Sequence, residues 1–138
     1  MNQTVLFLCP HSAAKSVLAA AYFQQLADER KLSWRAAFAG TDPDAELSPK
    51  VMALLRDEGI DVSAQQPRRV TADELQSAWR VVSLGCEPNA LPAARADLIR
   101  WDDVPPLSQN APAARDAIRA HVERLVDELA RALPKETA

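Results

Sequence analysis

A cysteine, two serines and a lysine lie close together in the sequence "LCPHSAAKS", which starts at Leu8. An apolar run ends at Cys9 and a helical pattern follows, which predicts a loop between a strand and the N-terminus of a helix. The free amide groups of such a loop converge, and the helix dipole favours negative charge there. The same field favours the thiolate of Cys9, Lys15 adds a positive charge, and Ser16 can donate a hydrogen bond to the sulfur. These residues predict a nucleophile that attacks a tetrahedral oxyanion.

The amide groups of this loop form the predicted anion site. The predicted oxyanion-binding residues are Pro10, His11, Ser12, Ala13, Ala14, Lys15 and Ser16. A plainer interpretation is that Cys9 is a small buried residue at a strand end, where free cysteines are common.

The strands that must position this loop are predicted from apolar, β-rich runs at residues 4–9, 33–40, 79–85 and 97–101. Helical patterns lie between and after them, and this alternation predicts a parallel sheet with helices on both faces. Cys9, Cys86 and the pair Asp102 and Asp103 each follow a predicted strand. Because the carboxyl ends of parallel strands meet at one edge of the sheet, all four are expected at that edge.

The predicted helices carry recognisable start and stop signals. Ser12 is predicted to cap a helix over residues 13–30, and Ser48 to cap a helix that begins at Pro49 and ends at Gly59. A capping box from Thr71 to Glu74 opens a short helix at 71–75. A final amphipathic helix starts near Asn110, with an apolar stripe of Ile118, Val122, Leu125, Val126, Leu129 and Leu133.

The composition is that of an ordinary globular protein. The chain has 138 residues, which predicts a single domain over 1–138, and 48% of them are hydrophobic. The net charge of −3 gives no broad basic field for nucleic acid, and no apolar run approaches the ~20 residues of a membrane span. Two cysteines and no leader-like start indicate a cytoplasmic protein with free thiols. Neither the cysteines nor His11 and His121 show ligand spacing, so no metal or organic cofactor is expected.

The chain resembles the low-molecular-weight protein tyrosine phosphatase superfamily, and within it the thioredoxin-coupled arsenate reductases. The loop of that family reads Cys, five residues, Arg, Ser, and Cys9, Ser12 and Ser16 stand at matching places. The segments at 38–43, 54–70, 79–87 and 99–106 and the final helix also resemble the family, so the resemblance covers almost the whole chain. It implies a flavodoxin-like, three-layer α/β fold with a four-stranded parallel sheet.

Four departures from the family pattern bear on activity. Lys15 replaces the loop arginine, so one point charge stands where a planar fork would clamp two oxygens. His11 and Ser12 replace a glycine and an asparagine; His11 either crowds the loop, adds a donor or faces solvent. The position of the catalytic Asp in the family's Asp-Pro pair falls at Pro105, which leaves Asp102 and Asp103 as candidate acids or as plain turn residues.

The fourth departure concerns the cysteines that relay oxidation in the reductases. Cys86 is the one candidate, shifted by one residue, and Leu91 stands at the other position. Cys86 is therefore either a resolving thiol for Cys9 or a buried strand-end cysteine. Arg68 and Arg69 either reach the anion site in place of the missing guanidinium or are exposed loop charges.

Two functions follow as expectations. The first is an enzyme of low activity, a hydrolase or an oxidoreductase, in which Cys9 attacks a phosphate monoester or arsenate. Phosphate, arsenate or sulfate would bind the loop, and Cys86, thioredoxin or a low-molecular-weight thiol would resolve an arsenate adduct. The second is a catalytically impaired relative that binds oxyanions, senses redox state or contacts another protein.

Overall fold

The computed structural model describes residues 3–132 and contains one four-stranded parallel sheet. The strands are β1 (Thr4–Leu8), β2 (Arg35–Ala39), β3 (Arg80–Ser83) and β4 (Ile99–Arg100), in the spatial order β2-β1-β3-β4. Phe7 at the centre pairs with Phe38 on one side and Val82 on the other. The central strand β1 is apolar from Val5 to Leu8 because both of its faces are buried there. The predicted fold class is confirmed.

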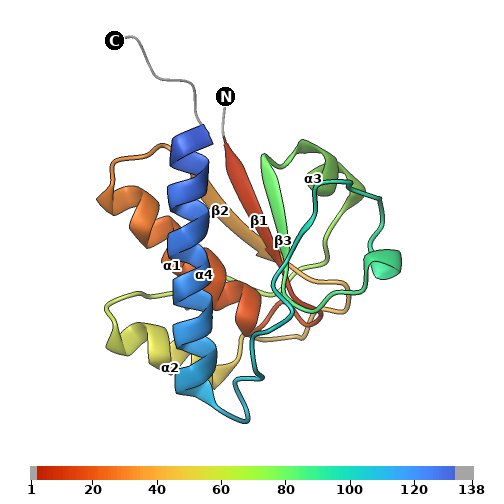
Figure 1. Ribbon diagram of the computed structural model, residues 1–138. Helices are drawn as coiled ribbons and strands as arrows, with labels where there is room; N and C mark the ends of the chain where they lie inside the picture. Colours follow the sequence, from red (N-terminus) through yellow and green to blue (C-terminus); the bar gives the residue numbers. More distant parts are fainter. Residues whose placement is uncertain (1–2, 133–138) are drawn as a thin grey trace.

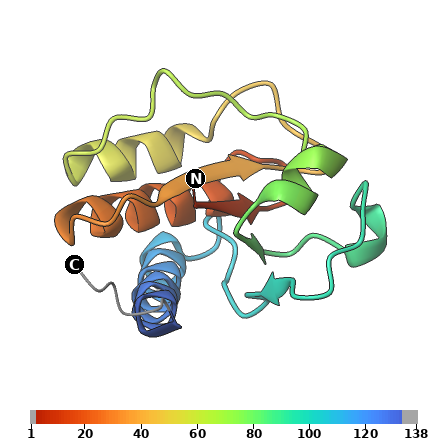
Figure 2. The ribbon, with the colours of Figure 1, turned by 90° about the horizontal axis from the view of Figure 1, so that it is seen from above.

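Helices cover the two faces of the sheet unequally (Figures 1 and 2). The helices α1 (Lys15–Glu29), α2 (Pro49–Asp57) and α4 (Ala111–Ala132) share one apolar core with one face of the sheet. The short α3 (Ala72–Ser77), the 3₁₀ turn η1 (Pro88–Ala90) and irregular segments cover the other face, around a smaller core that contains Leu6, Leu8 and Leu75. The sheet is thus the middle of three layers.

Most of the predicted helix signals are confirmed. The Ser48 hydroxyl accepts a hydrogen bond from the Val51 amide at 3.4 Å, and Pro49 stands at the first position of α2. Thr71 and Glu74 form the predicted capping box at the start of α3. The Asn110 side chain accepts from the Ala113 amide at 3.1 Å at the start of α4. The predicted stripe residue Leu133 lies outside the described residues.

The prediction that Ser12 caps the first helix is wrong. α1 begins at Lys15, and its N-cap residue Ala14 makes no side-chain capping bond. Ser12 instead adopts a left-handed conformation, with φ +54°, and its buried hydroxyl accepts from the Arg68 amide at 3.3 Å. The chain must turn back on itself at this point to form a closed loop, and that turn removes Ser12 from the capping position.

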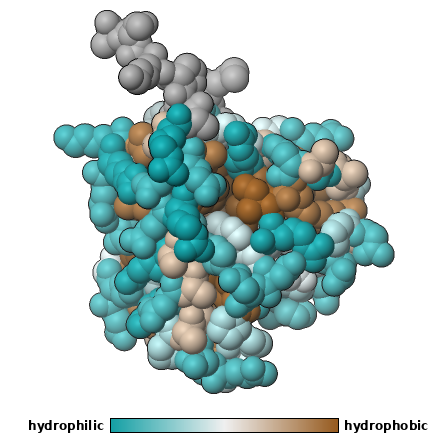
Figure 3. Space-filling model, viewed as in Figure 1, coloured by the Kyte–Doolittle hydropathy of each residue, from teal (hydrophilic) through white to brown (hydrophobic). Residues whose placement is uncertain are grey.

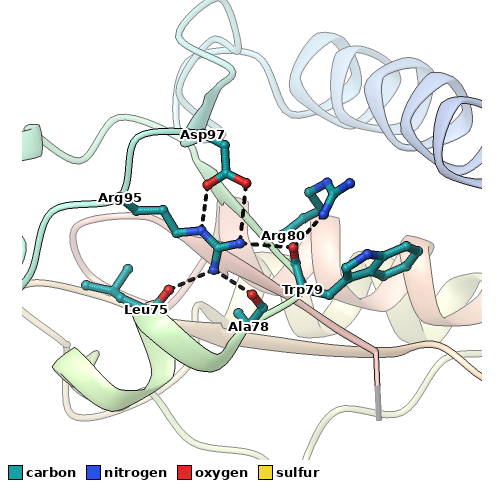
Figure 4. Close-up of polar contacts among 6 residues, drawn as sticks. All are labelled: Leu75, Ala78, Trp79, Arg80, Arg95 and Asp97. Carbon is teal, nitrogen blue, oxygen red and sulfur yellow. Dashed lines mark hydrogen bonds and ion pairs between the residues drawn. The ribbon is translucent and has the colours of Figure 1, made fainter. Parts of the chain in front are cut away.

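Arg95 links the segment after Cys86 to the end of α3 and to the residue before β3 through hydrogen bonds (Figure 4). Its Nη1 donates to the carbonyls of Leu75 at 2.7 Å and Ala78 at 2.5 Å, and its Nη2 donates to that of Trp79 at 3.0 Å. Its Nε pairs with Asp97 at 2.7 Å and holds the pKa of that carboxyl below its ordinary value. One largely buried guanidinium therefore satisfies the carbonyls where α3 ends and β3 begins.

The surface is mostly hydrophilic on the face shown in Figure 3, including much of the outer side of α4. Apolar residues come to this surface mainly between α4 and α3. Within residues 3–132, no helix combines the length and the apolar character needed to cross a bilayer.

Candidate active site

Cys9 directly follows β1 and is almost fully buried, with 4% of its surface exposed. Its Sγ lies 2.9 Å from the Ser16 hydroxyl and 3.4 Å from the Ser16 backbone amide. Ser16 belongs to the first turn of α1, where backbone N–H groups lack helical partners. The sulfur thus lies at the positive end of a helix, where the Ser16 amide donates to it and the Ser16 hydroxyl is within hydrogen-bond distance.

The loop turns its carbonyl groups outward. The carbonyls of Pro10 and His11 accept from the amides of Asp42 at 2.7 Å and Asp44 at 2.9 Å, and the Ala13 carbonyl accepts from Ser48 at 3.0 Å. The inner side is left to amides that have no acceptor among residues 3–132, namely those of His11, Ala13, Ala14 and Lys15. Free, convergent N–H groups above a sulfur form a cradle for the oxygens of a tetrahedral anion.

Gly40, at the end of β2, allows the loop to close. A Cβ atom at this position would lie 2.5 Å from the Cys9 carbonyl oxygen, 2.6 Å from that of Pro10 and 2.8 Å from the Ser12 nitrogen. Any side chain would therefore push the loop away from the sheet.

A cavity of about 610 Å³ opens above the loop. It is lined by Cys9, Pro10, His11, Ala14, Lys15, Asp44, Ser48, Lys50, Leu84, Gly85, Pro106, Leu107 and Ser108. Lys15 lines this cavity, and its Nζ donates to the carbonyl of Val104 at 2.9 Å. A second cavity of similar volume, about 600 Å³, lies between α1 and residues 59–65, and its lining contains no cysteine, serine, lysine or histidine.

The two candidate aspartates do not line this cavity. Asp103 pairs with His121 of α4 at 2.8 Å, and this hydrogen bond holds the pKa of the Asp103 carboxyl below its ordinary value. Asp102 pairs with Arg100 at 3.0 Å. His121 also stacks on Trp101, with ring centroids 4.7 Å apart. The loop after β4 reaches the cavity through residues 106–108, while the carboxylates that precede them form ion pairs elsewhere.

Cys86 does not line the cavity, although Leu84 and Gly85 before it do. Its thiol is buried, 4.0 Å from the Thr41 hydroxyl, and burial raises its pKa above the ordinary value. Both cysteines are free thiols. The two arginines considered as replacements for the loop guanidinium also have other partners, because Arg68 pairs with Glu74 and Arg69 donates to the Thr41 carbonyl at 2.7 Å.

The sequence of residues 4–97 matches the model of a protein family described as low molecular weight phosphotyrosine protein phosphatase. The chain belongs to this family. A Halobacterium salinarum protein named "Putative arsenate reductase" is 30% identical over 125 residues, which make up 89% of this chain and 87% of that protein.

Solved structures show the same fold. YfkJ from Bacillus subtilis superposes with a TM-score of 0.87 at 20% identity, over 97% of this chain and 98% of its own. A thioredoxin-dependent arsenate reductase from Corynebacterium glutamicum reaches a TM-score of 0.79 at 22% identity, over 95% of this chain and 63% of its own. The family fold is therefore present along nearly the whole described chain.

Three residues at or beside the cavity were not identified as site residues from the sequence. Lys50 and Asp44 line it without belonging to the loop, and Gly40 permits the loop's closure. Gly40 could have been identified from the sequence, because it ends the strand predicted over residues 33–40. Asp44 lies in an irregular loop and Lys50 in the first turn of α2, and only tertiary structure brings both to the cavity. Among residues 3–132, no three His, Cys, Asp or Glu residues form a group that could hold a metal ion.

Proposed function

We propose that this protein catalyses attack by the Cys9 thiolate on a tetrahedral oxyanion, with low activity, in an arsenate reductase-like or phosphatase-like reaction. The observation that carries the proposal is the contact of Cys9 Sγ with the amide and the hydroxyl of Ser16 at the N-terminus of α1, beside loop amides without an acceptor and at the cavity. A cysteine sulfur at a helix N-terminus beside an anion cradle is positioned for displacement at phosphorus or arsenic.

In the phosphatase-like reaction, Cys9 Sγ forms a bond to phosphorus as the ester oxygen leaves and takes up a proton. Water then attacks phosphorus, the S–P bond breaks, and the thiolate is restored. The amides of the loop and Lys15 stabilise the charge on the three other oxygens during both steps. Lysine offers a single charge in place of an oriented fork, and this supports a low rate.

In the reductase-like reaction, Cys9 Sγ forms a bond to arsenic as water leaves. A second thiol attacks Cys9 Sγ, a disulfide forms, and arsenite departs with the electron pair of the S–As bond. The burial of Cys86 and its raised pKa favour an external thiol, from thioredoxin or a small molecule, as the attacking group. The named relative from Halobacterium salinarum supports this branch.

The test measures turnover of p-nitrophenyl phosphate and of arsenate with thioredoxin or a low-molecular-weight thiol. We expect slow turnover of at least one substrate, its loss in Cys9→Ser, and retention of arsenate turnover in Cys86→Ser. Sulfate binding by calorimetry is the control for an intact loop. A protein that binds sulfate but turns over neither substrate contradicts the proposal.

That negative result would favour the second candidate, an oxyanion-binding or redox-sensing relative without catalysis. The observation that favours it is the placement of Asp102 and Asp103, whose carboxylates both pair outside the cavity. Oxidation of Cys9 by peroxide, followed by mass spectrometry, would then separate redox sensing from anion binding alone.

A further inference from the structure

Catalysis at Cys9 needs a proton for the leaving group, and the cavity offers few groups that can supply one. Of the residues that line it, His11 carries an imidazole and Asp44 a carboxyl group, which are the side-chain groups that most often act as general acids and bases. Lys15 and Lys50 supply positive charge at the same cavity. The aspartates of the loop after β4 are absent from the lining.

His11 is held at the cavity through one nitrogen of its ring. Its Nδ1 lies 3.2 Å from the Asp42 carbonyl oxygen and 3.4 Å from the Asp44 carboxylate. A carbonyl oxygen only accepts hydrogen bonds, so the bond to Asp42 requires that Nδ1 carries the proton. Nε2 has no partner within the described part of the chain, which leaves it as the nitrogen that can exchange a proton.

Charged groups lie around His11 in the cavity. The Asp44 carboxylate lies beside Nδ1, and Lys15 and Lys50 line the same cavity. The side chain of His11 is exposed, so water can reach the ring and exchange protons with it.

We propose that His11 is the general acid and base of this site and that Asp44 is its positioning residue. This inference rests on the proposed function. As Cys9 Sγ bonds to phosphorus and the P–O bond breaks, Nε2–H of the imidazolium gives its proton to the leaving oxygen, which departs as an alcohol or phenol. In the second step the neutral Nε2 takes a proton from water as that water attacks phosphorus and the S–P bond breaks. Phosphate and the thiolate result, and the imidazolium is restored.

The test compares two esters that differ in their need for an acid. The phenolate of p-nitrophenyl phosphate leaves readily, whereas that of phenyl phosphate requires protonation. In His11→Asn the amide can still donate to the Asp42 carbonyl but cannot transfer a proton near neutral pH. We expect kcat/KM to fall about 10²-fold for phenyl phosphate, the range of a lost general acid, and at most about fivefold for p-nitrophenyl phosphate.

Two further variants make the comparison specific. Asp103→Asn should change kcat/KM of the two esters by the same factor, because its carboxylate pairs with His121. Asp44→Asn removes the carboxylate beside Nδ1 and should lower kcat/KM for phenyl phosphate by a larger factor than kcat/KM for p-nitrophenyl phosphate.

Equal losses for both esters in His11→Asn would overturn the role of His11. A loss selective for phenyl phosphate in Asp103→Asn would assign the acid to Asp103 instead. Both outcomes leave the proposed function intact as long as Cys9→Ser abolishes turnover. Absence of turnover in the wild type, with sulfate still bound, would overturn the proposed function and this inference with it.

Discussion

At the scale of the single residue, Lys15 joins two parts of the site. It stands at the cavity with Cys9, and its Nζ donates to the carbonyl of Val104 in the loop after β4. An ammonium group can serve this carbonyl and an anion together because it has three donors, but it cannot hold two oxygens in one plane as a guanidinium does. Its charge is thus available to the anion with weaker geometric control.

Lys15→Arg should raise kcat/KM for p-nitrophenyl phosphate at least about tenfold, because a planar fork restores oriented donors to the transition state. Lys31→Arg, beyond the end of α1, is the matched control and should leave turnover unchanged. Equal turnover in wild type and Lys15→Arg would mean that proton supply, rather than the loop cation, limits the rate.

Gly40→Ala should destabilise the protein by about 1–3 kcal/mol, the range for inserting atoms into a packed site, and should abolish sulfate binding. The added Cβ would lie within 2.8 Å of three backbone atoms of the loop. Urea unfolding and sulfate calorimetry measure the two effects. Gly59→Ala is the control, since Gly59 has φ +82° but a Cβ there would meet no atom within 4 Å beyond its chain neighbours. It should cost stability while sulfate still binds.

At the scale of the element, α3 illustrates how contacts at both ends support a helix too short to be stable alone. It has six residues, with a capping box at its start and the Arg95 guanidinium at its last carbonyls (Figure 4). Glu74 belongs to the capping box and also pairs with Arg68. The hydrogen bond from Arg68 is the main cause that lowers the pKa of the Glu74 carboxyl.

A carboxyl whose pKa is lower in the folded state stabilises the protein above its unfolded pKa of about 4.3, and this stability is lost as pH falls through the folded value. Glu74→Gln should therefore lower the free energy of unfolding by about 1 kcal/mol at pH 7 and make little difference near pH 3. Urea unfolding at both pH values tests this. Asp73→Asn, in the same turn, should show a smaller difference between the two pH values, and equal pH dependence of both variants would contradict the assignment.

At the scale of the whole molecule, a polar cluster connects the three helices on one face of the sheet. The Tyr22 hydroxyl of α1 donates to Glu58, which follows α2, at 2.6 Å, and Arg119 of α4 pairs with the same carboxylate. The Arg119 guanidinium also lies over the Tyr22 ring, 4.6 Å from its centroid. Burial raises the pKa of the Tyr22 hydroxyl, which therefore remains a donor throughout the physiological range.

Tyr22→Phe should lower the free energy of unfolding by about 1.5–3 kcal/mol, as expected for a lost hydrogen bond to a charged group. Combined with Arg119→Met, the loss should be smaller than the sum of the single losses because both residues share Glu58. Asp127→Asn removes the exposed α1–α4 ion pair with Arg30 and should cost under about 1 kcal/mol. Strict additivity in the double variant would contradict a shared cluster.

The sequence by itself determined the sheet and the loop after its first strand, and it predicts Cys9 as the nucleophile. Short apolar runs rich in β-branched residues between helical patterns favour buried parallel strands, and Cys9 follows the first of them. Capping residues such as Ser48 and Thr71 act on amides within three residues, so their effect is local and readable. The expected contact of Ser16 with the sulfur was also a consequence of one loop and one helix turn.

Tertiary structure alone decided where the long side chains of the site point. Asp103 faces α4 because it pairs with His121, eighteen residues further along the chain. Lys15 donates to the carbonyl of Val104, which is also distant in sequence. Ser12 accepts from Arg68 rather than capping α1 because closure of the loop requires its left-handed turn. Such choices depend on partners distant in sequence, whose competing hydrogen bonds differ by little free energy and leave no periodic signal. For the same reason, no sequence pattern predicted that Asp44 and Lys50 line the cavity of Cys9.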